Sequence, residues 1–425
     1  MLLYIHVPFC RFKCRYCAFY SEPLSELTDP GGAVRDYTQT LLSEIALWGD
    51  RLGTVAVESV FFGGGTPSLL PPNALAAILD RLRGAFVISP KAEISLEANP
   101  DSFLAIGYAH ETAALGINRI SLGVQSLNED ALAALGRPHG RREAQMAYEQ
   151  ARAAGFGSVS FDLIWGLPGQ RRRDWMRELA EAVKMQPDHL SCYGLTLEDG
   201  TPMARAHDEG LISLPSEKDQ AAMYVDGADY LETAGYLQYE ISNFARMGFQ
   251  CRHNVGYWES ADYIGMGPGA TSTLKGLRWT NPQNLAEWAD RVRRGTVGND
   301  AERLTPKIRL LETVMLRLRT TRGLRLKAYR ELTGRDFMKD NKELLHLLHR
   351  QGLARFRNGY ARLTRTGMLV SNAILEHLFD AVDNQLPGDG NSLPPAGEPS
   401  LPPVPGKTGK SGAPEPENGR ETQKD

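Results

Sequence analysis

Three of the five cysteines lie close together near the start of the chain, in the spacing Cys10-x3-Cys14-x2-Cys17. Thiolates are soft ligands that bind zinc, copper(I) and iron–sulfur clusters, and one short loop can bring three of them together. A [4Fe–4S] cluster normally takes four cysteines, so a set of three leaves one iron open to a further ligand. The residues alone also allow three buried structural cysteines, or a zinc site that His6 completes.

A glycine run and a series of strand-end polar residues extend the candidate site. The run FGGGTPS contains Gly64, Gly65 and Thr66, and glycine lets the backbone approach a ligand whose carboxylate its NH groups can hold. Four later apolar runs end in polar side chains, namely Glu97, Gln125, Asp162 and Thr196. In a β/α barrel the carboxyl ends of the strands form the active-site face. A plain glycine turn and helix caps are the alternatives, but recurrence on consecutive strands favours a site.

Short apolar runs alternate with helical stretches over residues 1–195. The runs are rich in β-branched and aromatic residues, which predicts strands at Tyr4–Val7, Val57–Phe62, Ile94–Ala98, Arg119–Val124, Val159–Ile164 and Leu190–Leu195. Helical patterns lie between them, at Tyr37–Trp48, Ala74–Leu82, Glu143–Ala154 and Asp174–Val183. The alternation predicts parallel βα units. Six units in series indicate a barrel or partial barrel, and a doubly wound open sheet is the competing architecture.

The remainder of the chain divides into three further sections. Residues 196–300 are less regular, with one helix predicted at Glu217–Ala234 and the aromatic motif HNVGYW at residues 253–258. Residues 301–380 are predicted to form a small helical domain with a hairpin like that of a winged helix. Lys and Arg outnumber Asp and Glu there more than twofold, which we interpret as solvent-exposed helix faces rather than a nucleic-acid surface. Residues 381–425 are rich in Pro, Gly and Ser and are predicted to be disordered.

Composition and charge indicate a globular protein of a reducing compartment. The 425 residues are 42% hydrophobic with a formal net charge of -3, which gives no argument for a nucleic-acid partner. The sequence contains neither an apolar run long enough to span a membrane nor a secretory signal. We therefore expect a cytoplasmic protein, because clustered cysteines in the cytoplasm more often bind metal or do redox work than form disulfides.

The CxxxCxxC loop after the first predicted strand resembles the cluster motif of the radical S-adenosylmethionine (SAM) superfamily. The resemblance implies a partial (β/α)6 barrel in which Cys10, Cys14 and Cys17 bind one [4Fe–4S] cluster. SAM would chelate the open iron, and one electron from the cluster would cleave it to methionine and a 5′-deoxyadenosyl radical. The GGGTP run is similar to the motif that holds the amino acid part of SAM. Thr66 stands where many members have Glu, a variant of the coproporphyrinogen III dehydrogenase branch.

The same resemblance gives a set of candidate SAM contacts. It combines the glycine motif, the strand-end residues, one tyrosine before the cluster loop and one arginine: Tyr4, Gly64, Gly65, Thr66, Glu97, Gln125, Arg137, Asp162 and Thr196. Solvent contacts for Gln125 and Arg137, and core packing for Tyr4, are the alternatives.

Five motifs in the expected order resemble the HemW family of heme chaperones, which is related to oxygen-independent coproporphyrinogen III dehydrogenase. They are YIHVPFC, GGGTPS, LGVQS, FDLIWGLPGQ and HNxxYW, and with the basic section the resemblance covers residues 1–380. Two departures separate the chain from the dehydrogenase. Phe19 stands where that enzyme has a further Cys, and only nine residues precede Cys10 where the enzyme has a substantial arm.

The resemblance implies a protein that binds heme and transfers it to acceptors such as respiratory cytochromes, with an electron donor for its cluster. His253 is the candidate axial ligand, because imidazole commonly ligates heme iron and aromatic rings can stack on a porphyrin. A buried histidine beside core aromatics and ligation by Cys251 are the alternatives, and Cys192 is expected in the core.

Two other functions stay open. One is enzymatic, the radical oxidative decarboxylation of coproporphyrinogen III in porphyrin biosynthesis, and the other is a radical SAM reaction on a different substrate. Whether the chain is an enzyme is therefore not decided by its sequence. Peripheral contact with a membrane through the basic section also stays open.

Overall fold

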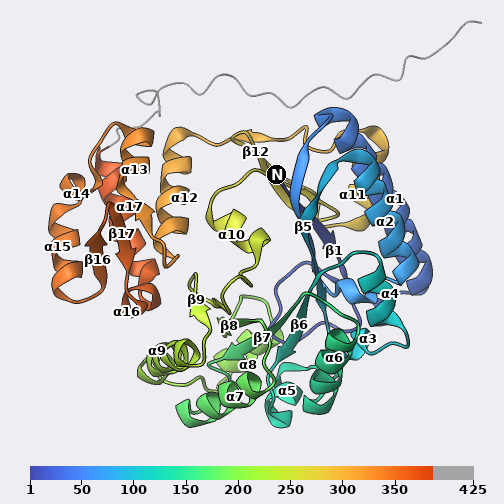
Figure 1. Ribbon diagram of the computed structural model, residues 1–425, viewed down its shortest axis with the longest axis horizontal. Helices are drawn as coiled ribbons and strands as arrows, with labels where there is room; N and C mark the ends of the chain where they lie inside the picture. Colours follow the sequence, from blue (N-terminus) through green and yellow to red (C-terminus); the bar gives the residue numbers. More distant parts are fainter. Residues whose placement is uncertain (386–425) are drawn as a thin grey trace, which may run out of the picture.

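Six parallel strands form the centre of the fold in the computed structural model, which describes residues 1–385. They are β1 (Leu2–Val7), β4 (Ala56–Gly64), β5 (Val87–Ala98), β6 (Arg119–Gln125), β7 (Ser158–Trp165) and β8 (His189–Gly194). Their order in the sheet is β1-β4-β5-β6-β7-β8, each parallel to its neighbour, which confirms the six strands predicted from the sequence. The curved sheet in Figure 1 is the predicted partial (β/α)6 barrel. Of the section predicted to be disordered, residues 381–385 are instead the end of a helix, and residues 386–425 lie outside the described residues.

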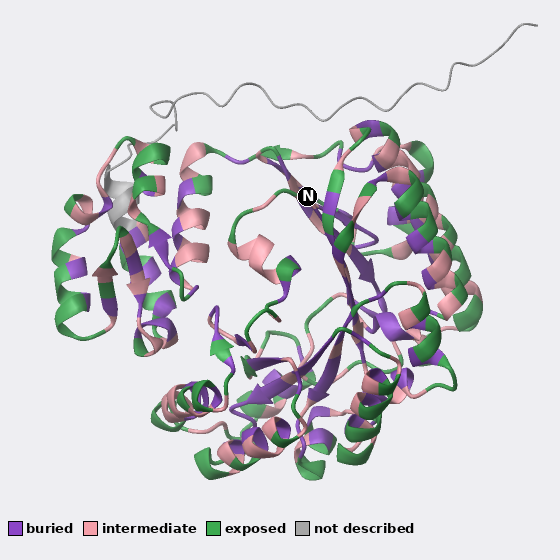
Figure 2. Ribbon diagram, viewed as in Figure 1, coloured by how far each residue is buried: buried purple, intermediate pink, exposed green. Residues whose placement is uncertain are grey.

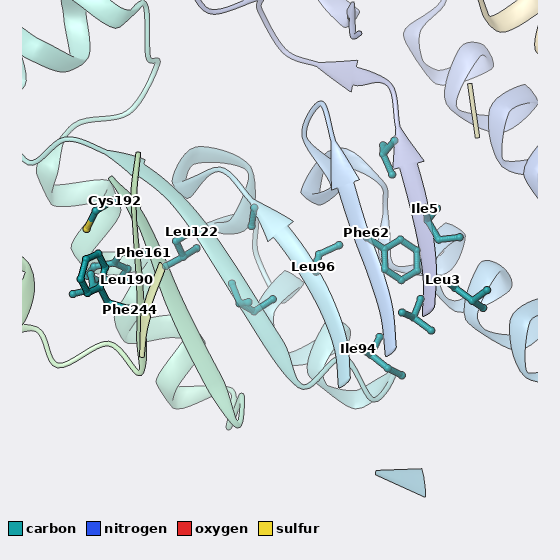
Figure 3. Close-up of a cluster of buried hydrophobic side chains, with 14 of the residues drawn as sticks. Leu3, Ile5, Phe62, Ile94, Leu96, Leu122, Phe161, Leu190, Cys192 and Phe244 are labelled. Carbon is teal, nitrogen blue, oxygen red and sulfur yellow. The ribbon is translucent and has the colours of Figure 1, made fainter. Parts of the chain in front are cut away.

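Helices cover the outer face of this sheet. The four longest in this part confirm the predicted ones: α1 (Pro30–Leu52), α2 (Pro72–Ala85), α6 (Arg141–Ala153) and α7 (Arg172–Lys184). Alternate strand residues point outward as one apolar layer, which Figure 3 shows from Leu3 and Ile5 on β1 to Leu190 on β8. Burying this layer under the helices removes apolar surface from water and supplies the main stabilisation of the barrel. Figure 2 shows the same division, with buried strands and helices that are exposed on one side.

The concave face of the sheet carries polar side chains instead. Strand register places Ser59 opposite Glu93, Glu97 opposite Ser121, and Asp162 opposite Ser191. Because successive side chains of a strand alternate between the two faces, these residues share the inner face at every second position. Shorter helices complete the barrel: η1 (Leu24–Glu26), η2 (Pro67–Leu69), α3 (Pro100–Phe103), α4 (Tyr108–Ala114), α5 (Glu129–Leu135) and α8 (Pro202–Asp208).

Residues 196–300 extend the sheet at both edges, which the sequence does not predict. Helix α9 (Glu217–Thr233) confirms the predicted helix, and β9 (Leu237–Gln238) and β10 (Asn243–Ala245) then run antiparallel beyond β8. At the other edge β11 (Tyr263–Met266) pairs in parallel with β1. The strands that follow complete a sheet of 12: β12 (Thr271–Leu274), β13 (Leu277–Thr280) and β14 (Glu302–Arg303), with α11 (Leu285–Arg294) between the last two.

The C-terminal section is the predicted small helical unit with a hairpin. Its helices are α12 (Pro306–Leu318), α13 (Leu326–Thr333), α14 (Phe337–Asp340), α15 (Lys342–Arg350), α16 (Arg365–Leu369) and α17 (Ser371–Gln385). Its sheet has the order β15 (Leu324–Arg325), β17 (Tyr360–Leu363), β16 (Ala354–Arg357), which gives the winged-helix-like arrangement. Arg365 joins this unit to the barrel by ion pairs with Asp229 and Glu232 on α9. Within the described part of the chain no helix has the length and apolar character to cross a membrane.

Candidate functional site

The cysteine loop leaves the carboxyl end of β1 through the short strand β2 (Phe9–Cys10), which pairs with β3 (Glu22–Pro23). Cys10, Cys14 and Cys17 are free and half-buried. Arg137 donates from Nη1 to the Cys14 sulfur over 3.3 Å, and the Thr66 hydroxyl donates to the Cys10 sulfur over 3.5 Å. The structure thus brings two candidate SAM contacts against two of the three candidate ligands.

The donor chemistry of this loop fits a bound cluster. Burial raises the pKa of the Cys17 thiol, and the Cys14 and Cys10 sulfurs raise it further. The three sulfurs are therefore close enough to repel one another as thiolates, and a metal centre would relieve that repulsion. In residues 1–385 as they stand, no three His, Cys, Asp or Glu side chains are already gathered in a metal-binding arrangement.

The glycine motif lies directly beneath the cysteine loop. The NH groups of Gly65 and Thr66 donate to the carbonyls of Val7 and Phe9 over 2.8 and 2.7 Å. A Cβ at Gly65 would lie 2.5 Å from the Phe9 carbonyl oxygen, so no larger residue fits without moving the loop. Gly64 has φ +109, and a Cβ there would meet the His6 ring. Glycine is required at both positions because the backbones of the two loops approach so closely.

His6 orients the loop. Its Nδ1 lies 3.1 Å from the Tyr4 hydroxyl and its Nε2 lies 3.1 Å from the Tyr20 carbonyl oxygen. Both ring nitrogens therefore have protein partners, so His6 has no free nitrogen for the zinc alternative. Tyr4 points to the inner face, stacked on Phe61 with ring centroids 6.3 Å apart.

Two half-buried carboxyl groups lie on the inner face of the sheet, Glu97 on β5 and Asp162 on β7. Burial, together with the nearby Asp162 charge, raises the pKa of Glu97 to about 8, and the Gly64 NH donates to its Oε2 over 3.3 Å. Burial also raises the pKa of Asp162, whose two oxygens each accept from the Ser121 hydroxyl at 3.0 Å. At neutral pH Glu97 is therefore protonated, and a cationic ligand would favour its ionised form.

Asn99 connects the glycine motif to Arg137, and sequence reasoning missed it. Its amide donates to the Thr66 hydroxyl over 3.3 Å, and its oxygen accepts from Arg137 Nη2. The same guanidinium group donates to the Gly123 carbonyl over 2.9 Å. Asn99 follows β5 by one residue, so its position just past a strand end was the available signal.

The other two sequence candidates are Gln125, at the end of β6, and Thr196, just beyond the end of β8. Gln125 ends β6 with φ +62, a left-handed conformation that is strained for a residue with a side chain. Thr196 is exposed and lies two residues beyond the end of β8. Backbone strain at a strand end is typical of functional positions, which supports Gln125 as a site residue. The position of Thr196 gives no comparable support for a site role.

The HNVGYW motif folds into the short helix α10 (Arg252–Trp258), which lies inside the curve of the sheet (Figure 1). Glu93 on β5 holds its start. The backbone NH groups of Arg252 and His253 donate to the Glu93 carboxylate over 3.1 Å each, and the Cys251 thiol donates over 3.4 Å. Sequence reasoning missed Glu93, although it shares the inner face with Ser95 and Glu97 at alternate positions.

His253 is buried against the inner face of β1 and β4. Only 2% of its surface is exposed, and its Nδ1 lies 2.9 Å from the Ser59 hydroxyl. The ring stacks on Phe61 with centroids 5.0 Å apart, and burial lowers its pKa to about 3. Its Nε2 is buried without a hydrogen-bond partner among the described residues. The structure therefore presents a neutral imidazole with one uncommitted nitrogen.

The remaining two cysteines, Cys192 and Cys251, are buried and therefore unreactive. Cys192 is 5% exposed within the core, as predicted. Burial raises the pKa of Cys251 to about 12, so this thiol stays protonated. A protonated thiol bound to Glu93 is a poor metal ligand, which weighs against the Cys251 alternative.

Comparison with known proteins places the chain among characterised relatives. Residues 4–182 match the radical SAM superfamily, and residues 304–370 match the HemN C-terminal domain. The heme chaperone HemW of Mycobacterium tuberculosis is 35% identical over 379 residues, covering 89% of this chain and 94% of that protein. The heme chaperone HemW of Synechocystis sp. is 39% identical over 331 residues, covering 76% and 78%.

A solved structure shares the fold. Coproporphyrinogen III oxidase (HemN) from Escherichia coli, described as a radical SAM enzyme, superposes with a TM-score of 0.74 at 24% identity, covering 91% of this chain and 90% of that one. At this level of identity the likeness concerns architecture alone.

Proposed function

The chain belongs to the HemW family of heme chaperones within the radical SAM superfamily, and we propose that it binds heme and passes it to acceptor proteins. Respiratory cytochromes are the expected class of acceptor. The five free cysteines support a reducing compartment such as the cytoplasm.

The barrel end is proposed to hold a [4Fe–4S] cluster and SAM. Cys10, Cys14 and Cys17 would ligate the cluster, which supplies one-electron chemistry when an external donor reduces it. Arg137 and Thr66 support this assignment, because each donates a hydrogen bond to one of the sulfurs. The proposed SAM contacts are the candidates of the sequence, Tyr4, Gly64, Gly65, Thr66, Glu97, Gln125, Arg137, Asp162 and Thr196. Glu97 suits the positive charge of SAM, since desolvation disfavours ionisation of this carboxyl and a neighbouring cation would favour it.

His253 is the proposed axial ligand of heme iron. The observation that carries this proposal is its buried, unpartnered Nε2, which is the nitrogen that a metal would take. In the position of α10 seen here, the other nitrogen, Nδ1, lies 2.9 Å from the Ser59 hydroxyl and holds the ring against the sheet. Because the imidazole is 2% exposed, heme binding requires α10 to move away from the sheet. Glu93, Ser59 and the Phe61 stack are the contacts that such a movement would break.

One experiment separates the chaperone from the related decarboxylating enzyme. The protein is reconstituted anaerobically with iron, sulfide and SAM and offered heme or coproporphyrinogen III in parallel. We expect stoichiometric heme uptake without consumption of coproporphyrinogen III, because the exposed Phe19 leaves no further thiol in the loop. Repeated turnover of coproporphyrinogen III would overturn the proposal.

A further inference from the structure

A cavity lies between the C-terminal unit and the barrel, away from the cysteine loop. Its volume is about 800 Å³, within the range of small-molecule sites. Helix α9 and strand β9 form one wall, and β16, β17 and α16 form the other. The residues that define its chemistry are Leu237, Arg355, Arg357, Arg362, Arg365 and Met368.

The cavity has more positive charge than its own acids neutralise. Arg365 is occupied by Asp229 and Glu232. Arg355 and Arg357 alternate along β16, so both point to the same side of the strand, and neither forms an ion pair among the residues whose side chains are described. Arg355 also lies directly opposite Arg362 on β17. Like charges directly opposite on neighbouring strands are destabilising, so the arrangement favours a bound anion.

The lining is apolar as well as basic. Leu237 and Met368 face the same space as the arginines, and the Arg362 guanidinium stacks over the Tyr360 ring at 5.2 Å. A nucleic-acid backbone needs an extended basic surface, whereas a half-open cavity with exposed arginines and apolar walls suits a small amphiphile. A single arginine can recognise a carboxylate through two parallel hydrogen bonds, so two arginines can hold two carboxylates.

We propose that this cavity binds the carboxylate edge of a porphyrin, with Arg355 and Arg357 on the two carboxylates. The identity of the porphyrin rests on the proposed heme function, whereas the cavity and its charge do not. The site is separate from His253, so it holds the ligand by its acidic edge and not by iron.

The test uses iron-free protoporphyrin IX, whose fluorescence reports binding and whose lack of iron removes any contribution of His253. In the full chain, the double variant Arg355→Gln, Arg357→Gln is expected to raise the Kd for protoporphyrin about tenfold or more, as for the loss of one charged hydrogen-bonding interaction. The Kd for protoporphyrin dimethyl ester, which lacks free carboxylates, should be the same in both proteins. Arg293→Gln, Arg294→Gln on α11 is the control, since it removes the same charge from an exposed helix.

The outcomes distinguish this inference from the proposed function. An unchanged Kd for protoporphyrin in the double variant overturns the inference, as does equal weakening for the acid and its ester. Loss of binding to double-stranded DNA with protoporphyrin binding intact also overturns it in favour of a nucleic-acid surface. If His253→Ala abolishes the spectrum of bound heme iron but leaves protoporphyrin binding intact, both proposals stand. If the wild type ligates no heme iron but binds protoporphyrin through the arginines, only the proposed function fails.

Discussion

Arg137 is the side chain that connects most parts of the cofactor site. One guanidinium group reaches the Cys14 sulfur, the Asn99 side chain and the Gly123 carbonyl, which belong to three different elements of the barrel end. Burial alone would lower its pKa, but Tyr16 and Cys14 raise it overall, so the group stays charged. This fixed, half-buried cation lies 3.3 Å from the Cys14 sulfur, where it would offset the negative charge of a cluster held by that sulfur.

Removing any one of the three loop cysteines should abolish the cluster. We expect Cys10→Ser, Cys14→Ser and Cys17→Ser to reduce iron after anaerobic reconstitution from about four atoms per chain to near zero, because two thiolates do not hold a [4Fe–4S] centre. Iron and sulfide analysis with visible absorption measures this. Cys192→Ala is the matched control and should keep its iron, since that thiol lies in the core. Full iron in a loop variant would show that the ligands lie elsewhere.

Glu97 makes the stability of the protein depend on pH. Its pKa is about 8 in the fold against 4.5 for an unperturbed Glu, so the unfolded chain releases the proton first as pH rises. Stability conferred by this group is thus lost between pH 4.5 and 8, by at most about 1.4 kcal/mol per unit, and then levels off. We expect Glu97→Gln to melt at the same temperature as wild type at pH 5 and higher at pH 9. The same difference in melting temperature between Glu97→Gln and wild type at pH 5 and at pH 9 would contradict the assignment.

At the scale of elements, some strands and helices can be predicted from the periodicity of their own residues, whereas others form because of contacts with distant segments. The six parallel strands follow from apolar runs that one layer of helices must cover, so each could be predicted from its own residues. Helix α10 could not, because it is short and contains Gly256, Val255 and Tyr257, which have low helix propensity. It forms where Glu93 accepts its first NH groups. Strands β9 and β10 are likewise too short to be predicted from their own residues.

Breaking the Glu93 contact should loosen α10 specifically. Glu93→Ala leaves two backbone donors and the Cys251 thiol without an acceptor, and we expect a loss of about 1–2 kcal/mol of stability. Amide hydrogen exchange of residues 252–258 should rise well above that of the parallel strands. Glu58→Ala removes an exposed carboxylate from neighbouring β4 and should leave exchange unchanged. Unaltered protection of α10 in Glu93→Ala would show that the helix is held by its aromatic contacts alone.

At the scale of the whole molecule, one sheet of 12 strands continues from the cofactor barrel into the segments that carry α10. The backbone of Thr321 donates to the Tyr239 carbonyl over 3.1 Å, and the Asn254 amide donates to the Tyr239 hydroxyl over 3.2 Å. Tyr239 therefore touches both the helix of the HNxxYW motif and the segment of the C-terminal unit between α12 and β15. None of these contacts between distant segments has a signature in local sequence, and the cavity between α9 and β16 is unpredictable for the same reason.

Heme titration of the anaerobically reconstituted protein tests the central claim most directly. The account predicts that wild type ligates the iron of one heme per chain, seen as a shifted Soret band, and that His253→Ala loses this ligand signature. His110→Ala, which changes an exposed histidine on α4, should behave as wild type. Binding by His253→Ala with unchanged stoichiometry and spectrum would contradict the account.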